Sequence, residues 1–172
     1  MIPYHREYEY YLAGIFKMSV TPRSGAGRHH KLDGHGRSLM SEAKTSPRKE
    51  PRRHTVKRDE WLAAEKHARH KLKKLMWNVL LANYSVTIMK VADLSDLGMD
   101  FEKFLDAGEF FKLPTNFAGS FTLEQDVFEI MDSETRQGGK TKWICFLKGW
   151  EHTLALMKSE DLATELEGVD AL

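Results

Sequence analysis

The spacing of apolar residues divides the chain near residue 60. In residues 18–57 apolar side chains are isolated among Ser, Gly, Pro, His, Lys and Arg. Such a composition does not offset the entropy cost of ordering a backbone, so we expect residues 18–57 to be disordered. Beyond it, apolar residues recur at steps of three and four, namely Trp61, Ala64, Ala68, Leu72, Leu75 and Val79. This period predicts one long helix over residues 59–83, with Asp59 as its N-cap.

After this helix the pattern becomes mixed. We expect a short strand at 85–89, two short helices at 91–98 and 100–108, and a strand at 109–113. Residues 121–131 and 142–150 are rich in β-branched and aromatic residues, and Gly138 and Gly139 lie between them. This arrangement predicts an antiparallel hairpin with the two glycines at its tip. Residues 151–167 are helical in pattern, with Ser159 as a cap, and we find no internal repeat.

The order of these elements indicates an α+β domain that is winged-helix-like: a long helix, short helices and a β-hairpin. The stretch DLGMDFEKFLDAGEFFKL, residues 96–113, is similar to the end of a LOTUS-type winged helix. In that family a Leu-Gly and a Phe-Leu pair precede an apolar strand. The resemblance implies a winged helix and identifies no chemically specific residue.

These patterns divide the chain into three segments. Residues 1–17 are a short aromatic segment that could dock on the body, residues 18–57 a disordered basic arm, and residues 58–168 the folded domain. The chain has a single cysteine, Cys145, which excludes an intramolecular disulfide framework and fits a reducing compartment. No apolar run approaches the roughly 18 residues that a membrane-spanning helix needs, so we expect no membrane partner.

Charge is separated along the chain, although the formal net charge is only +1. Residues 17–74 hold 17 Lys/Arg and 6 Asp/Glu, whereas residues 75–172 hold 8 Lys/Arg and 17 Asp/Glu. A basic block of this kind is typical of segments that bind polyanions, so we predict a DNA- or RNA-binding regulatory protein. The alternative is a protein–protein adaptor, in which the acidic body binds the partner and the arm serves only for nuclear targeting or phosphoregulation.

The basic residues most able to contact nucleic acid fall in three groups. The first is the cluster at 46–58, which also resembles a nuclear localisation signal; the second is one face of the predicted helix; the third is the tip of the predicted hairpin, or wing. The candidate residues are Arg48, Lys49, Arg52, Arg53, Lys57, Arg58, Lys66, His70, Lys73, Lys74, Arg136, Lys140 and Lys142. Trp77 falls on the same predicted helix face, and its size favours burial over stacking on a base.

Two further features concern regulation and location. Ser46 precedes a proline and basic residues, and Thr55 follows an Arg-Arg-His sequence, so both resemble kinase sites. Phosphate at either position would weaken contact with a polyanion. We expect a nuclear protein, with a cytoplasmic location as the alternative. The Arg-, Ser- and His-rich composition of residues 17–41 is also compatible with a mitochondrial presequence.

No pattern indicates catalysis or a cofactor. Cys145 lies in an apolar strand pattern, which predicts a buried and inert thiol. His67 and His70 are one helical turn apart but lack further ligands at metal-binding spacing. The Gly-Lys-Thr at 139–141 lacks the earlier glycine of a phosphate-binding loop. We therefore expect a protein that is not an enzyme and that carries no metal or cofactor.

Overall fold

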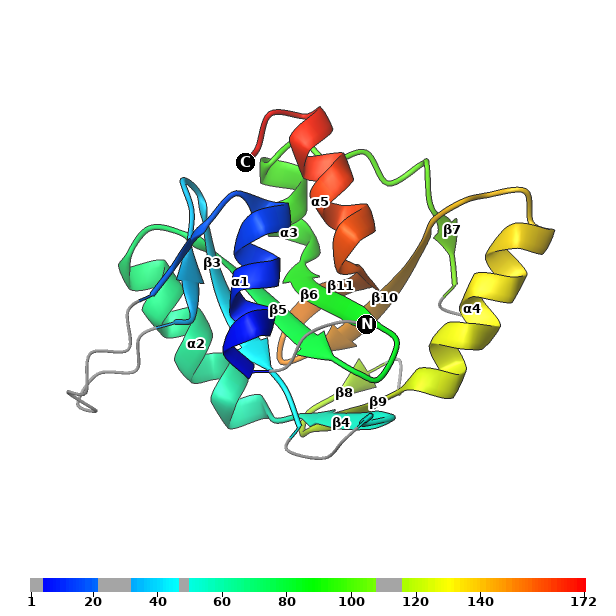
Figure 1. Cartoon of the computed structure of the whole chain (residues 1–172), viewed down its shortest axis with the longest axis horizontal. Coiled ribbons are helices and arrows are strands. Elements are labelled where there is room, and N and C mark those ends of the chain that lie inside the picture. The colour runs from blue at the N-terminus through cyan, green and yellow to red at the C-terminus, as the bar shows by residue number, and fades with distance from the viewer. Residues whose placement is uncertain (1–4, 22–31, 47–49, 108–115) are drawn as a thin grey trace.

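The computed structural model describes residues 5–21, 32–46, 50–107 and 116–172, and its fold is α+β (Figure 1). The helices are α1 His5–Phe16, α2 Arg58–His70, α3 Val91–Asp96, α4 Gln125–Gln137 and α5 Ser159–Gly168. The strands are β1 Ser19–Val20, β2 Gly34–His35, β3 Leu39–Lys44, β4 Arg53–Val56, β5 Lys74–Leu80, β6 Ser85–Lys90, β7 Leu105–Asp106, β8 Asn116–Phe117, β9 Phe121–Glu124, β10 Trp143–Gly149 and β11 His152–Lys158.

Most strands join one mixed sheet in the order β1-β2-β3-β5-β6-β11-β10-β7, and β8 also pairs with β10. The four central strands β5, β6, β11 and β10 pair with one another in antiparallel fashion. On either side of them, β3 runs parallel to β5, and β7 and β8 run parallel to β10. Strands β4 and β9 form a separate antiparallel pair.

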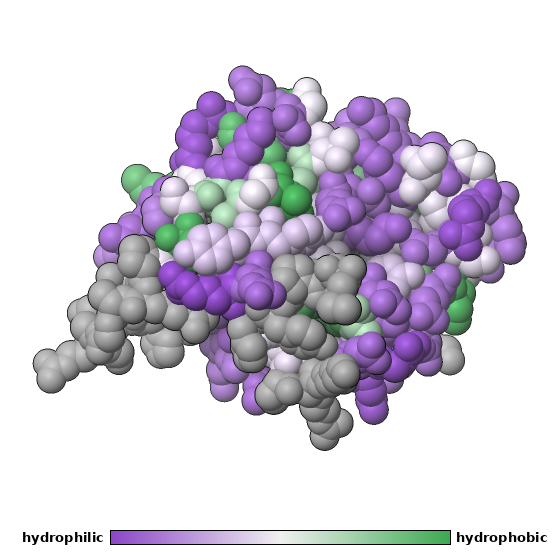
Figure 2. Space-filling model, in the orientation of Figure 1, coloured by the Kyte–Doolittle hydropathy of each residue, from purple (hydrophilic) through white to green (hydrophobic). Residues whose placement is uncertain are grey.

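The sheet separates two hydrophobic layers, so its central strands are apolar on both faces. One layer contains the buried sides of α2 and α4 and the β4–β9 pair, and the other contains α1, α3 and α5. In the view of Figure 1, α2 and α4 lie toward opposite ends of the sheet, with α1, α3 and α5 between them. Figure 2 shows that hydrophilic residues cover most of this face, with exposed apolar residues in small separate groups.

The predicted helix over 59–83 is wrong in its second half. Helix α2 ends at His70, Leu72 takes a positive φ of 57°, and β5 begins at Lys74. Every residue from Leu75 to Leu80 is buried. A strand buried on both faces lacks the alternation that marks a half-exposed strand, so its apolar residues extended the helical pattern by coincidence. Trp77 belongs to this strand and is fully buried, as its size indicated.

The predicted winged-helix hairpin is also wrong. Only residues 121–124 are a strand, and α4 follows because Val127, Phe128 and Met131 occupy one buried helical face. Gly138 and Gly139 end this helix, with φ of +72° at Gly139. Strand β10 pairs with β11, through a turn at residues 150 and 151 that both have positive φ. Two such residues are what a tight two-residue hairpin loop requires.

The described part of the predicted disordered arm is folded. Strand β3 pairs with β5 over six residues, and its Leu39, Met40 and Ser41 are buried. Strand β4 pairs with β9, and Val56 is fully buried. Isolated apolar residues are therefore enough to order these two strands, because each one packs into a core that the rest of the chain forms. Residues 22–31 and 47–49 of the expected arm lie outside the described residues, as do residues 108–113 of the segment that resembles a LOTUS domain.

The element order occurs twice, contrary to the expectation of no repeat. The order β4-α2-β5-β6-α3 is repeated as β9-α4-β10-β11-α5. In the β6–β11 ladder Ile88 pairs with Leu156, its equivalent 68 positions later. On either side, Lys90 pairs with Leu154 and Val86 pairs with Lys158. The same shift of 68 turns each of these two pairs into the other, because Leu154 is the equivalent of Val86 and Lys158 the equivalent of Lys90. The two halves are therefore related by a pseudo-twofold axis at this pair.

The β4–β9 pair obeys the same symmetry. Thr55 pairs with Thr122, 67 positions later, and their Oγ1 atoms are 3.0 Å apart. In the sequence the repeat survives as Met89-Lys90-x-x-Asp93-Leu94 and Met157-Lys158-x-x-Asp161-Leu162. Helix α1 belongs to neither half and covers part of one sheet face.

Candidate functional site

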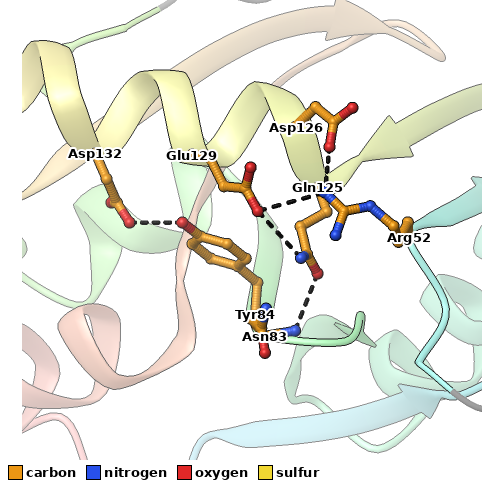
Figure 3. Close-up of polar contacts among 7 residues, drawn as sticks. All are labelled: Arg52, Asn83, Tyr84, Gln125, Asp126, Glu129 and Asp132. Carbon is orange, nitrogen blue, oxygen red and sulfur yellow. Dashed lines mark hydrogen bonds and ion pairs between the residues drawn. The ribbon is translucent and has the colours of Figure 1, made fainter.

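The cations of the cluster at 46–58 do not form a free arm. Arg48 and Lys49 lie outside the described residues. The Arg52 guanidinium pairs with Asp126 and lies 3.4 Å from Glu129, both on the exposed side of α4 (Figure 3). Arg53 pairs with Glu124 at 3.1 Å. These arginines dock on the acidic body of their own chain.

Two more cations of this cluster, Lys57 and Arg58, are exposed at the N-terminal end of α2. They line an open hollow of about 590 Å³ whose other walls include Asp59 and Glu60. The mixture of signs gives this hollow no net preference for an anion. Of the predicted kinase sites, Thr55 is exposed in β4, and Ser46 is half-buried before the undescribed residues 47–49.

Of the three predicted wing residues, Lys140 and Lys142 lie in the α4–β10 connection and Arg136 in the last turn of α4. Lys142 donates a hydrogen bond to Glu165 at 2.6 Å, and Lys140 donates one to the carbonyl oxygen of Glu102 at 3.2 Å. Burial acts to raise the pKa of Glu165, but the hydrogen bonds and positive charges of Lys142 and Lys103 outweigh it and hold that pKa below its usual value. Arg136 is exposed at the end of α4. Without the hairpin, the basis for a basic wing is lost.

The remaining predicted cations gather at the C-terminal end of α2. Lys66 and His70 are exposed on the helix together with Arg69, and Lys71 follows it. None of these four side chains has an ion pair within the described part of the chain. We call Lys66, Arg69, His70 and Lys71 the α2 basic surface.

A cavity of about 320 Å³ adjoins this surface. Its walls come from the end of α2, the start of β5, the end of β6 and α3. Four cations and two carboxylates line it, together with three apolar residues: Arg69, Lys73, Lys74, Lys90, Glu65, Asp93, Ala68, Leu72 and Leu75. We call it the basic cavity, because its formal charge is +2 from the four cations and two carboxylates.

The ion pairs inside the basic cavity are long. Lys90 lies 3.8 Å from Glu65 and 3.9 Å from Asp93, and Lys74 lies 3.9 Å from Asp93. Burial raises the pKa of Asp93, and the two lysines oppose that shift. Each ammonium group has three donors, so these loose contacts leave donors for an incoming anion. Lys73 is held more tightly, by a 2.5 Å hydrogen bond to the carbonyl oxygen of Gly36.

A second cavity, of about 330 Å³, lies beside α4. Its most connected group is Asp132, which accepts hydrogen bonds from Tyr84 at 2.7 Å, Trp143 at 2.8 Å and Lys158 at 2.9 Å. Burial acts to raise the pKa of Asp132, but these three donors and the charge of Lys158 together lower it. Figure 3 shows Tyr84 reaching from the β5–β6 turn to Asp132, with Glu129 nearby on the same helix.

The pseudo-twofold axis relates one carboxylate–lysine pair of each cavity. Glu65 of α2 corresponds to Asp132 of α4, and Lys90 of β6 corresponds to Lys158 of β11. The turn residue Tyr84, which contacts Asp132, corresponds to His152, whose Nε2 atom lies 3.6 Å from Glu65. Each helix carboxylate thus lies next to a lysine of its own half and a turn residue of the other half, but only Asp132 is hydrogen-bonded to both.

The sequence predicted only part of these two sites. Lys73 and Lys74 were predicted, but Arg69 and Lys90 of the basic cavity and all residues of the second cavity were missed. The repeated Met-Lys-x-x-Asp-Leu motif was the signal that could have found Lys90 and Lys158, since it places the same lysine after the last buried residue of two equivalent strands.

Other chemistry is limited within the described residues. Cys145 is buried, and burial raises its pKa to about 12, so its thiol stays protonated near neutral pH. No three His, Cys, Asp or Glu side chains gather as metal ligands in the described segments. None of the helices found there is long and apolar enough to cross a membrane. Comparison of the chain with protein-family models, with curated proteins and with solved structures gives no match.

Proposed function

We propose that the protein binds nucleic acid as a regulatory factor, and that the α2 basic surface and the basic cavity make the contact. The observation that carries the proposal is the convergence of Lys66, Arg69, His70 and Lys71, all exposed and without an ion pair among described residues, on a cavity lined by further cations. This site replaces the arm and the winged-helix body as the source of affinity.

A phosphate group fits the cavity by charge and by donor number. Lys74 and Lys90 hold their carboxylate partners at 3.5 Å or more, so a phosphate oxygen placed between them gains shorter hydrogen bonds. The exposed cations of α2 then lie where neighbouring phosphates of a strand can reach them. Such contacts position a backbone and carry no sequence specificity, so DNA and RNA are both ligands for the same surface.

The test is a salt titration of binding to a labelled DNA duplex and a labelled RNA strand, measured by fluorescence anisotropy. The variant K66Q/R69Q/K71Q removes three exposed cations of the α2 basic surface. The matched control R136Q/K140Q/K148Q removes three cations elsewhere, including two of the predicted wing. The first variant should flatten the log–log salt dependence by roughly 0.7 to 0.9 for each engaged cation, and the control should leave it unchanged.

Two results would overturn the proposal. The first is no binding by the parent protein at about 50 mM salt, where electrostatic attraction to a polyanion is strong. The second is an equal loss in both triple variants, which would mean that only overall charge matters. Nuclear location is part of the proposal, and fusion of the intact chain to a fluorescent protein would test it.

The adaptor alternative rests on the acidic surface formed by the end of β9 and the exposed side of α4. Arg52 and Arg53 pair with Asp126, Glu129 and Glu124, so this surface accepts guanidinium groups of its own chain. A basic segment of a partner could displace them. A variant that changes Asp126 and Glu129 to Gln should abolish such binding and leave nucleic-acid binding intact.

A further inference from the structure

We propose that the cavity beside α4 binds a small organic cation that carries a primary ammonium group. Helices α1, α4 and α5, strands β6 and β11 and the β5–β6 turn contribute its walls, so it belongs to the folded body. Its lining residues are Tyr11, Asn83, Tyr84, Ser85, Glu129, Asp132, Lys158 and Glu160. Three carboxylates and one lysine give the lining a formal charge of −2, opposite to that of the basic cavity.

The negative charge is available because Asp132 already neutralises Lys158. Their atoms are 2.9 Å apart, and Tyr84 and Trp143 complete the hydrogen bonding of that carboxylate. The remaining acids are Glu129 and Glu160, and both are exposed to the cavity mouth. Glu160 accepts one hydrogen bond from Tyr11 at 2.5 Å, which leaves lone pairs on both of its oxygens.

Glu129 is held loosely. Its two described partners, Gln125 and Arg52, lie at 3.3 and 3.4 Å (Figure 3). The approach of Arg52 shows that a cation is attracted to this carboxylate in the folded chain. A free ammonium group can come closer to Glu129 than Arg52 does, because the Arg52 side chain is tethered to the backbone.

The pseudo-twofold axis supplies independent support. The pair Asp132–Lys158 has its counterpart in Glu65–Lys90, so this pair belongs to the repeated framework. The two cavity-mouth acids do not. Glu129 corresponds to Leu62, 67 positions earlier on α2, and Glu160 corresponds to Ala92, 68 positions earlier on α3. The fold therefore forms without acids at these positions, and only this half of the molecule carries them.

The surrounding groups define the ligand class. An anion is repelled by Glu129 and Glu160. A neutral apolar molecule would leave the polar groups of the cavity walls without hydrogen-bond partners. Tyr11 and Tyr84 add hydroxyl oxygens, each of which already donates its proton to a carboxylate and so presents acceptors. An aliphatic diamine is a probe of this class, because it carries two ammonium groups and the cavity offers two carboxylates, Glu129 and Glu160, besides Asp132.

The test is isothermal titration of the full chain with 1,5-diaminopentane up to about 10 mM, with glutarate, a dianion of equal length, as the ligand control. Diaminopentane should bind and glutarate should not. Glu129→Gln and Glu160→Gln should each weaken binding by about tenfold, as expected for loss of one charged hydrogen-bond partner. Both acids are exposed, so neither change should unfold the protein, and thermal melting checks this.

Three further variants sharpen the result. Glu124→Gln is the matched control, since it removes an acid of β9 that pairs with Arg53 outside the cavity, and affinity should not change. Arg52→Gln frees Glu129 from its competing cation, so affinity should rise. K66Q/R69Q/K71Q should leave diamine binding intact, which separates this site from the nucleic-acid proposal.

Three outcomes would overturn the inference. They are no heat of binding at about 10 mM diamine, equal binding of glutarate, or binding that survives both Glu129→Gln and Glu160→Gln. Loss of binding in Glu124→Gln to the same extent would also count against it, since it would indicate a general charge effect.

Discussion

Asp132 and Glu65 occupy equivalent positions in the two halves of the molecule. Replacing each one therefore gives a stability test in which one half is the control for the other. Both carboxylates are mostly shielded, with side chains 21% and 11% exposed, and each has a lysine, a tryptophan N–H and a turn residue as neighbours. Their distances differ. The contacts of Asp132 are 2.7 to 2.9 Å, whereas those of Glu65 are 3.3, 3.6 and 3.8 Å.

We compare two single substitutions, Asp132→Asn and Glu65→Gln. Each removes the negative charge and nearly conserves the volume of the side chain. Hydrogen bonds to a charged group contribute about 1.5–3 kcal/mol, and breaking a buried pair costs about 3–5 kcal/mol. Water reaches part of Asp132, so we expect Asp132→Asn to lower the free energy of unfolding by about 2–3 kcal/mol. Only one Glu65 contact lies within hydrogen-bonding distance, so Glu65→Gln should cost about 1 kcal/mol.

Urea unfolding followed by tryptophan fluorescence measures both values. The pH dependence gives a second readout, because the folded pKa of Asp132 lies below its ordinary value. A carboxyl group with a depressed folded pKa stabilises the protein above its unfolded pKa, about 3.9, and that stabilisation is lost as the pH falls through the folded pKa. The gap between parent and Asp132→Asn should therefore be full at pH 7 and shrink below about pH 4.

Equal costs for the two substitutions, or a larger cost for Glu65→Gln, would refute the distance argument. A gap between parent and Asp132→Asn that stays constant down to about pH 2.5 would show that the carboxylate is not the stabilising form.

The α+β class and the burial of Trp77 and Cys145 could be predicted from the sequence, because both rest on side-chain size and apolar content. The element boundaries could not. Residues 75–80 lie between the two core layers, so their apolar run carries no period of two. The Gly138–Gly139 pair satisfies a helix end as well as a hairpin tip, since both need a positive φ. Local patterns do not distinguish these alternatives.

The prediction of a disordered arm failed because local apolar density ignores long-range pairing. Strand β3 is held by its pairing with β5, more than thirty positions away. Leu39 of β3 and Leu75 of β5 lie in opposite hydrophobic layers, most of whose residues come from other segments. The same limit applies to the basic cluster, whose contact with nucleic acid stays a prediction. Charge separation along the sequence predicted contact with a polyanion, and it did not show that Arg52 and Arg53 pair with acids of their own chain.

The corrected fold makes two further predictions. Amide hydrogens of Met40 to Ala43 should exchange slowly with solvent deuterium, because β3 pairs with β5. Exchange within seconds, measured by mass spectrometry, would instead support the prediction of a disordered arm. Gly139→Val should lower the free energy of unfolding by about 1–3 kcal/mol, since a β-branched residue is strained at the observed φ of +72°. Gly138→Ala is the matched control: its φ is −78°, and an added Cβ would lie 3.4 Å from the nearest atom, an ordinary contact. Urea unfolding should therefore show a small change for Gly138→Ala and a large one for Gly139→Val. Equal changes would contradict the helix end placed here, because a turn centred on both glycines strains both positions alike.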